Sequence, residues 1–140
     1  MSAGRQRPIL VIGLGCQSGC PVSVLMGLIE VTLLEHRLAL SDITALASID
    51  SKSNEAGLLE LAEQLALPLT FFSAEQLAVF EPRLSHRSQI AFDNTGCYGV
   101  AESAALALAA QLGDGAATLM IERRNSSRAT FALAGSLRTL

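Results

Sequence analysis

The segment GLGCQSG, residues 13–19, carries the groups best placed to bind an anion. It follows the apolar run Ile9–Ile12 and precedes an apolar stretch with helical spacing, which predicts a loop between a strand and a helix. The start of a helix has free backbone N–H groups, and these bind phosphate or carboxylate ligands. We expect Gly13 and Gly15 to flank the turn and to let the backbone approach such a ligand.

A tight turn without a ligand is at least as well supported by the same residues. The segment is neither a Walker loop nor a complete dinucleotide fingerprint, because Gly19 falls one residue late and no Lys-Ser/Thr pair follows. Gln17 and Ser18 are its polar side chains. The motif alone therefore leaves both interpretations open.

Cys16, in the same segment, is the first candidate for a catalytic group. A thiol beside a helix start can have a lowered pKa and act as a nucleophile. No base is fixed next to it by the sequence, so a packed thiol is the favoured interpretation. Cys16 and Cys20 stand four residues apart without a second pair of ligands, and we predict no metal site.

A second polar segment, DSKSNE, places Asp50, Lys52 and Glu55 within six residues. Lys52 is the only lysine of the chain, so it is a candidate anion contact. A solvated lysine paired with Asp50 or Glu55 is an equally good interpretation. We expect Ser53 or Asn54 to cap the helix that follows.

Two further positions complete the polar set. Ser73 stands three residues before Gln76, which is the capping-box signature of a short helix. Glu102 lies in the first turns of an alanine-rich helix, residues 100–112, that is apolar nearly all round and is expected to be buried on several sides. A carboxylate interacting with the helix dipole is the favoured interpretation of Glu102, and an acid/base group at a cleft is the alternative. His36 and His86 do not stand at a spacing typical of metal ligands or of a catalytic triad, and we assign them no role.

Alternation of the predicted elements defines the fold class. Strands are expected at residues 9–12, 43–49, 67–72, 117–122 and 129–134, with a further possible strand at Gln89–Phe92. Helices are expected from Pro21 to about Leu38, from residue 54 to Pro68, from Ser73 and over residues 100–112. This order predicts an α/β protein, a three-layer α/β/α sandwich with a mixed, largely parallel sheet and a C-terminal β-hairpin. Residues 1–140 form one domain, with 1–7 disordered. Since ligands of such sheets bind at the carboxyl ends of the strands, the polar segments are expected to converge there.

Composition excludes several classes of function. The chain has 140 residues, a formal net charge of −3 and only 16% charged residues, so no nucleic-acid partner is predicted. The uncharged stretch from Pro8 to Ile29 is interrupted by glycines and Pro21, so no membrane span is predicted. Three cysteines give no disulfide framework and favour a reducing, cytoplasmic location.

Four blocks of the chain resemble the CobE/CbiG C-terminal domain family of cobalamin biosynthesis: VIGLGCQSG at 11–19, residues 46–77, TGCYGVAESAAL at 95–106 and residues 119–134. The resemblance implies a role in building the corrin ring, with a precorrin or corrinoid intermediate as ligand and no cofactor. The chain departs from the family pattern at Gln17 and Ser18, where arginines are frequent, and at Gly99, where serine is common. Arg123 or Arg124 replaces a lysine of the penultimate strand.

Three functions follow from the resemblance. The leading one is binding of a corrinoid intermediate, as a carrier or as an accessory to ring contraction. The others are an enzyme acting on a precorrin, such as a lactone hydrolase with Cys16, Lys52 and Glu102 as candidate catalytic residues, and a module that docks onto a pathway methyltransferase. Precorrins are flat apolar macrocycles fringed with carboxylates, so binding needs an apolar floor with N–H and cationic contacts at its edge. The predicted ligand-binding residues are Gly13, Gly15, Cys16, Gln17, Ser18, Asp50, Lys52, Glu55, Ser73, Thr95, Gly96 and Glu102.

Overall fold

The computed structural model describes residues 6–139, which form a mixed sheet covered by helices on both faces. The strands are β1 (Gln6–Cys16), β2 (Ala45–Ile49), β3 (Leu69–Phe72), β4 (Thr118–Asn125) and β5 (Ala129–Thr139). The α-helices are α1 (Val22–Glu35), α2 (Ala56–Leu65), α3 (Ala74–Ala78), α4 (Gln89–Thr95) and α5 (Val100–Leu112). Single 3-10 turns precede β2, follow β2 and follow α3. The predicted α/β class is confirmed.

The five strands lie in the order β3-β2-β1-β5-β4. β1, β2 and β3 are parallel, whereas β5 runs antiparallel to both β1 and β4. The C-terminal hairpin therefore enters the sheet beside its first strand, and the sheet is mixed as predicted. Gln6 and Arg7 pair with Thr139 and Arg138, so the expected disorder is wrong for these two residues, and residues 1–5 lie outside the described part.

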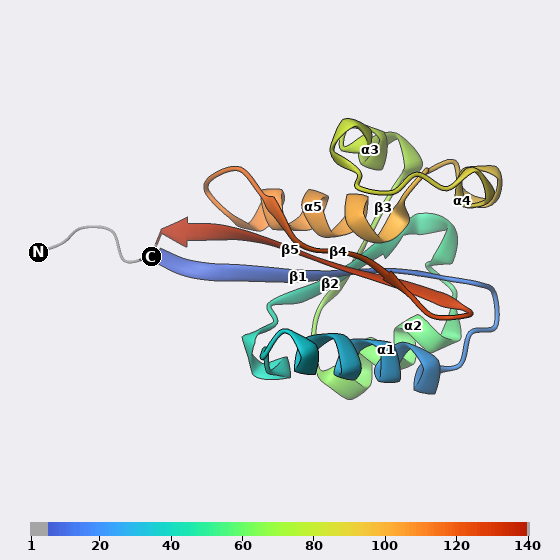
Figure 1. The fold of residues 1–140 in the computed structure, drawn as a ribbon, viewed down its shortest axis with the longest axis horizontal. Helices are drawn as coiled ribbons and strands as arrows, with labels where there is room; N and C mark the ends of the chain where they lie inside the picture. The colour runs from blue at the N-terminus through green and yellow to red at the C-terminus, as the bar shows by residue number, and fades with distance from the viewer. Residues whose placement is uncertain (1–5, 140) are drawn as a thin grey trace, which may run out of the picture.

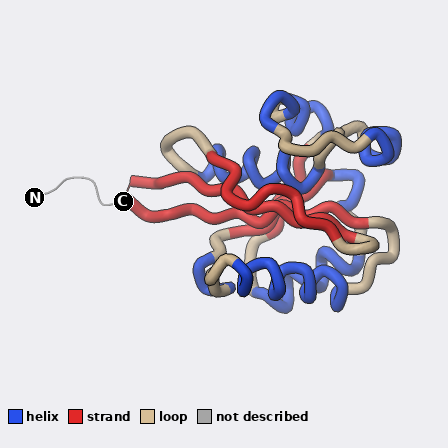
Figure 2. Tube along the Cα trace, in the orientation of Figure 1, coloured by secondary structure: helices blue, strands red, loops and turns tan. Residues whose placement is uncertain are grey.

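Helices lie on both faces of the sheet (Figures 1 and 2), and an apolar core lies between the sheet and each helical layer. Helices α1 and α2 cover one face, and α5, with α3 and α4 beyond it, covers the other. Side chains of a strand alternate between faces, and β1 shows this directly. Ile9 and Val11 belong to the core beneath α5, whereas Leu10, Ile12 and Leu14 belong to the core beneath α1 and α2.

Gly13 allows α5 to pack directly on β1. A Cβ atom at this position would lie 1.9 Å from the carbonyl oxygen of Ala101, so any side chain would collide with the helix backbone. The residues of α5 from Val100 to Ala109 are all buried, as the alanine-rich pattern predicted. β1 continues through Gly13 and Gly15 to Cys16, and the expectation that these glycines flank a turn is wrong.

Three local predictions are also corrected. Gln89–Phe92 is not a strand but the first half of α4, whose N-cap Ser88 accepts a hydrogen bond from the Ala91 N–H. The N-cap of α2 is Glu55, without a side-chain cap, rather than Ser53 or Asn54. α1 ends at Glu35, before Leu38. The capping box of Ser73 and Gln76 at α3 is confirmed.

β4 is one border of the sheet, and its pairing with β5 is irregular. The register shifts between Leu119 and Ile121 and again between Ile121 and Arg124. At the other border β3 is only four residues long. Within residues 6–139, no helix combines the length and the apolar character that crossing a membrane requires.

Candidate functional site

The predicted polar segments emerge at one edge of the sheet, where the parallel strands end. Ile49 pairs with Phe72, so Asp50 and Ser73 leave neighbouring strands at the same level. Gly13 pairs with Ala47, which brings the end of β1 to the same edge. Helices α1 and α5 both begin here, at the edge opposite to the chain ends (Figure 1). We call this edge, formed by residues 16–19, 50–55, 73–76 and 95–99, the rim.

Side-chain contacts join the first two segments of the rim. The Gly19 N–H donates to Oε2 of Glu55 at 2.8 Å, and Lys52 Nζ donates to Ser18 Oγ at 3.3 Å. Arg128, just before β5, adds a contact that sequence reasoning missed: its carbonyl accepts from the Gln17 N–H at 2.9 Å. Gln17, Ser18 and Gly19 are exposed, so this loop is the accessible part of the glycine-rich segment.

The other two segments of the rim also touch. A Cβ atom on Gly96, whose φ is +81°, would lie 3.3 Å from the Cβ atom of Ala74 at the start of α3. Thr95 Oγ1 donates to the Ala91 carbonyl at 2.6 Å and accepts from the Cys97 N–H at 3.1 Å. Thr95 and Gly96 therefore shape the turn before α5, and the Thr95 hydroxyl is already used within that turn.

Gly13 and Gly15 lie beneath the rim rather than on it. Both are buried in β1 and pair with β5, and a Cβ atom on Gly15 would lie 2.6 Å from Thr130 Oγ1. Below them Ser48 Oγ donates to the Leu14 carbonyl at 2.6 Å and ties β2 to β1. These residues position the loop at 17–19 through packing.

Cys16 is a protonated thiol at neutral pH. Burial raises its pKa to about 11, and the carboxylate of Glu55 adds to this, while the ammonium of Lys52 opposes it. Because the thiolate is the nucleophilic form, this raised pKa disfavours a thiol activated by the helix start and agrees with the packed thiol. Cys16, Cys20 and Cys97 are all free.

Glu102 is enclosed at the start of α5, with 1% of its surface exposed. Its carboxylate accepts from the Ser85 N–H at 2.8 Å, from the Arg123 N–H at 2.9 Å and from the Ser85 hydroxyl. The residue thus ties the loop before α4 and strand β4 to the first turn of α5. It lies in that first turn, as the dipole interpretation requires, and not on an open cleft.

Two further polar residues belong to this region: Ser85, which sequence reasoning missed, and His86, to which it assigned no role. Ser85 Oγ lies 2.7 Å from His86 Nδ1, and the same hydroxyl contacts Glu102. Their only signal in the sequence was a single carboxylate on an otherwise apolar helix, because the partners stand in an irregular segment 16 and 17 residues earlier.

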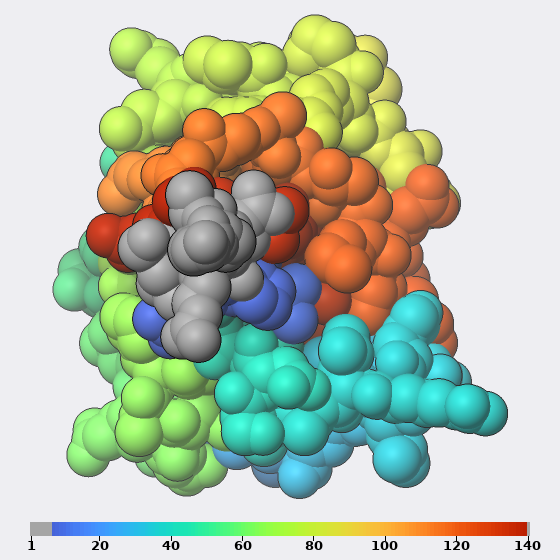
Figure 3. Space-filling view, turned by 90° about the vertical axis from the view of Figure 1, so that its left-hand side faces the viewer, coloured from blue at the N-terminus to red at the C-terminus, as the bar shows by residue number. Residues whose placement is uncertain are grey.

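Two of the cavities in the described part of the chain lie at opposite ends of the sheet. The smaller, about 320 Å³, lies at the rim between the starts of α1 and α2 and is lined by Gly19, Cys20, Pro21, Val22, Glu55, Ala56, Gly57 and Glu60. The larger, about 610 Å³, lies at the opposite end, between the start of β1, the end of β5 and the segment after α5. Figure 3 looks onto this end, where the blue start of β1 and the red end of β5 meet the orange segment. None of the predicted site residues lines the larger cavity. Among residues 6–139 no group of three or more His, Cys, Asp or Glu side chains could hold a metal ion.

The sheet order, the two helical layers and the rim at the parallel strand ends define a three-layer α/β domain with a polar edge suited to a ligand. The chain belongs to the family described as "Cobalamin synthesis G C-terminus", whose model matches residues 10–134. The resemblance inferred from the sequence blocks is thereby confirmed.

Named relatives agree with this family. Protein CobE of Sinorhizobium sp is 38% identical over 126 residues, which is 90% of this chain and 79% of that protein. A crystal structure of CobE, described as a protein from the cobalamin (vitamin B12) biosynthetic pathway, matches with a TM-score of 0.88 and 46% identity over 95% of this chain and 93% of that one. Cobalt-precorrin-5A hydrolase of Priestia megaterium is 32% identical over 126 residues, 90% of this chain, but the match spans only 32% of the hydrolase.

Proposed function

We propose that this protein binds a corrinoid intermediate of cobalamin biosynthesis along the rim. The observation that carries the proposal is the meeting of Lys52 with the loop at 17–19, because it places the only ammonium side chain beside an exposed loop whose Gly19 N–H already binds a carboxylate oxygen. A carboxylate of the ligand can be held there by charge-assisted hydrogen bonds. The family and its relatives support a corrinoid as the class of ligand.

The other predicted residues have two kinds of role in this proposal. Gln17, Ser18 and Asp50 are exposed at the rim and are available to contact polar groups of the ligand. Gly13, Gly15, Thr95 and Gly96 instead hold the loops in place. Ser73 caps α3, so its side chain is used within the protein.

Two of the three catalytic candidates are poorly suited to catalysis, which favours a binding function. The thiol of Cys16 is protonated, and the carboxylate of Glu102 is enclosed and hydrogen-bonded. Lactone hydrolysis on a precorrin is the second candidate function, supported by the relative named as a cobalt-precorrin-5A hydrolase. Lys52 is the catalytic candidate that remains accessible for it. Docking onto a pathway methyltransferase stays a prediction, as does the cytoplasmic location, with which three free cysteines agree.

Titration with hydrogenobyrinic acid, a cobalt-free corrinoid polycarboxylate, tests the proposal. We expect a shift in the absorbance of the pigment and its co-elution with the protein in gel filtration. Lys52→Ala should weaken binding about tenfold, the loss of one charge-assisted contact. Arg7→Ala, which removes one positive charge from an exposed position at the opposite end of the sheet, is the matched control. No pigment binding, or equal effects of the two variants, would contradict the proposal.

The second candidate is tested with cobalt-precorrin-5A. Opening of its lactone is seen in mass spectrometry as the gain of one water, and release of the two-carbon fragment as the loss of that mass. Either change would show that the chain is an enzyme. Recovery of unchanged bound pigment supports the binding role.

A further inference from the structure

Three polar side chains form a continuous hydrogen-bonded chain at the start of α5. Glu102 is its buried end, and its carboxylate contacts the Ser85 hydroxyl. Ser85 Oγ in turn lies 2.7 Å from Nδ1 of His86. His86 is exposed and forms the outer end of the chain.

The single hydroxyl hydrogen of Ser85 determines the direction of its bonds to Glu102 and His86. Glu102, taken as an ionised carboxylate, can only accept, so the Ser85 hydroxyl donates its only hydrogen to it, beside the N–H groups of Ser85 and Arg123. The hydroxyl oxygen can then only accept from His86, which places a hydrogen on Nδ1. In a neutral ring Nε2 consequently keeps its lone pair. Within residues 6–139 no protein group is hydrogen-bonded to Nε2, so this nitrogen is available to a ligand.

A proton on Nε2 of His86 would bring a positive charge to the hydrogen-bonded residues Glu102, Ser85 and His86. Glu102 has no ion-pair partner among the described residues, where the ion pairs are Arg87–Glu81 at 3.2 Å and Arg124–Glu35. The charged groups next to His86 in these contacts are Glu102 on α5 and Arg87 in the same loop, which pairs with Glu81. Arg123 on β4 reaches Glu102 through its backbone N–H, and its Nε atom is buried without a hydrogen bond. An imidazolium at His86 would supply a positive charge linked through Ser85 to the buried carboxylate.

His86 lies beside the rim. A Cβ atom added to Gly99, the N-cap of α5, would lie 3.3 Å from the carbonyl oxygen of His86. The guanidinium of the next residue, Arg87, lies 5.0 Å above the ring of Tyr98, which is stacked on Phe92 at 4.4 Å. The loop therefore offers two basic side chains and an aromatic pair, which suits the carboxylate fringe and flat ring of a corrinoid.

From this geometry we propose that His86 binds a carboxylate of the ligand and takes up one proton as it does so; this rests on the proposed corrinoid binding. The proton comes from the buffer and attaches to Nε2, which then donates a hydrogen bond to the ligand carboxylate. Nδ1–H stays on Ser85, and no covalent bond of the ligand changes. His86 thus adds a second carboxylate contact to the one at Lys52.

Calorimetry at pH 8, where an imidazole is ordinarily neutral, measures this proton directly. Hydrogenobyrinic acid is titrated into the protein in two buffers of different ionisation enthalpy, and the difference in heat gives the number of protons bound. We expect about one proton per ligand for the unmodified protein. His86→Gln should lose this uptake and bind about five- to tenfold more weakly.

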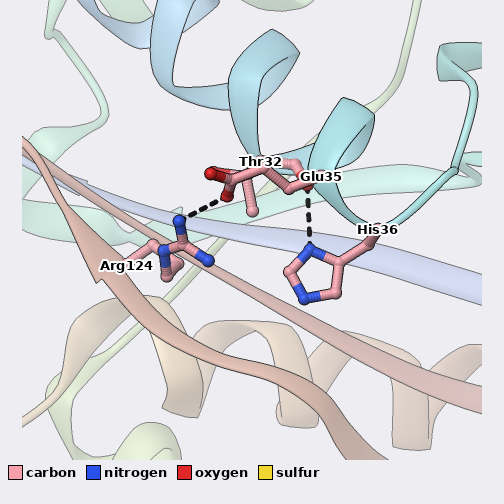
Figure 4. A network of polar contacts seen from close by, with 4 residues as sticks. All are labelled: Thr32, Glu35, His36 and Arg124. Atoms are coloured by element: carbon pink, nitrogen blue, oxygen red, sulfur yellow. Dashed lines mark hydrogen bonds and ion pairs between the residues drawn. The ribbon is translucent and has the colours of Figure 1, made fainter.

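The chain contains its own control, because His36 is the only other histidine. His36 Nδ1 lies 2.9 Å from the Thr32 carbonyl, so His36 has the same ring nitrogen engaged but no link to a buried carboxylate (Figure 4). His36→Gln should leave affinity and proton uptake unchanged. Ser85→Ala, at an exposed position, should reduce the uptake without unfolding the protein.

Two results would overturn the inference while leaving corrinoid binding intact. One is tight binding with a proton uptake that is the same in His86→Gln as in the unmodified protein, or that is absent in the unmodified protein. The other is a nitrogen NMR spectrum of the free protein that places the hydrogen of neutral His86 on Nε2. Absence of any binding would overturn both the inference and the proposed function.

Discussion

The backbone N–H of Gly19 donates a 2.8 Å hydrogen bond to the Oε2 atom of Glu55, which stands 36 residues later in the chain. A carboxylate of the protein thus already occupies one of the amide groups that the glycine-rich loop offers. The contact shows that an N–H group of this loop can bind a carboxylate oxygen. It also places a negative charge where a polycarboxylate ligand has to approach.

Replacing Glu55 by glutamine should therefore strengthen corrinoid binding. Glutamine keeps an oxygen that can accept from Gly19 but removes the charge that repels the ligand, and we expect affinity to rise about threefold. The measurement is an absorbance titration at low salt, because exposed charges are screened at high salt. Glu63→Gln, an exposed position on α2, is the charge-matched control. Binding by Glu55→Gln equal to that of the unmodified protein would mean that the ligand does not approach this loop.

Alkylation should show that Cys16 is a poor nucleophile. With a pKa of about 11, raised by burial and then by Glu55, about one thiol in a thousand is ionised at pH 8, three pH units lower. The rate of reaction with iodoacetamide, followed at Cys16 by peptide mass spectrometry, should rise about tenfold per pH unit between pH 8 and 10. Glu55→Gln should raise the rate and Lys52→Ala should lower it. A rate that levels off below pH 9 would contradict the assignment.

Asp114 should stabilise the fold only above acidic pH. Its carboxylate accepts a hydrogen bond from the Thr139 N–H at the end of β5, and this bond lowers the pKa of Asp114. A lowered folded-state pKa contributes stability above the unfolded value, near 3.9, and the contribution is lost as the pH falls through the folded value. Asp114→Asn should melt at a lower temperature than the unmodified protein at pH 6, and the two melting curves should converge below about pH 3. A constant difference at all pH values would exclude this contribution.

Gly13→Ala should destabilise the protein more than any cavity-forming change of similar size. The new methyl group would overlap the Ala101 carbonyl, and neither β1 nor α5 can shift easily because both are buried, so we expect a loss of about 2–3 kcal/mol or more. Urea denaturation measures it. Gly27→Ala, in α1 with nothing within 4 Å of the new Cβ atom, should instead stabilise the fold by about 0.5–1 kcal/mol. Equal stability of Gly13→Ala and the unmodified protein would contradict the packing described for α5.

Much of the fold could be predicted from periodicity and capping signals. The apolar stripe of α2, the capping box at Ser73 and the unbroken apolar surface of α5 all gave the correct element. α4 was missed because its short apolar stretch, Gln89–Phe92, also suits a strand. Its cap residues, Ser88 and Gly96, were the stronger signal. The placement of β5 between β1 and β4 depends on tertiary packing and has no local signal.

That the polar segments meet at one edge could be predicted because topology determines it, whereas individual side-chain contacts could not. Ser18, Lys52 and Ser73 follow parallel strands, so they lie at one edge of the sheet regardless of the side chains around them. By contrast, the chain from Glu102 to His86 depends on how an irregular loop folds over a helix. The roles of Gly13 and Gly15 were misjudged because a glycine that permits a turn and a glycine that permits close packing look identical in a sequence.

The shifts in register along β4 have a consequence for how copies of this protein meet in concentrated solution. A border strand that repeats its N–H and C=O groups evenly offers a template on which another molecule can add its own strand and start an aggregate. The two irregularities of β4 interrupt that template, and at the opposite border β3 is too short to provide one. The two borders therefore offer little template for strand addition in a chain of which half of the residues are hydrophobic.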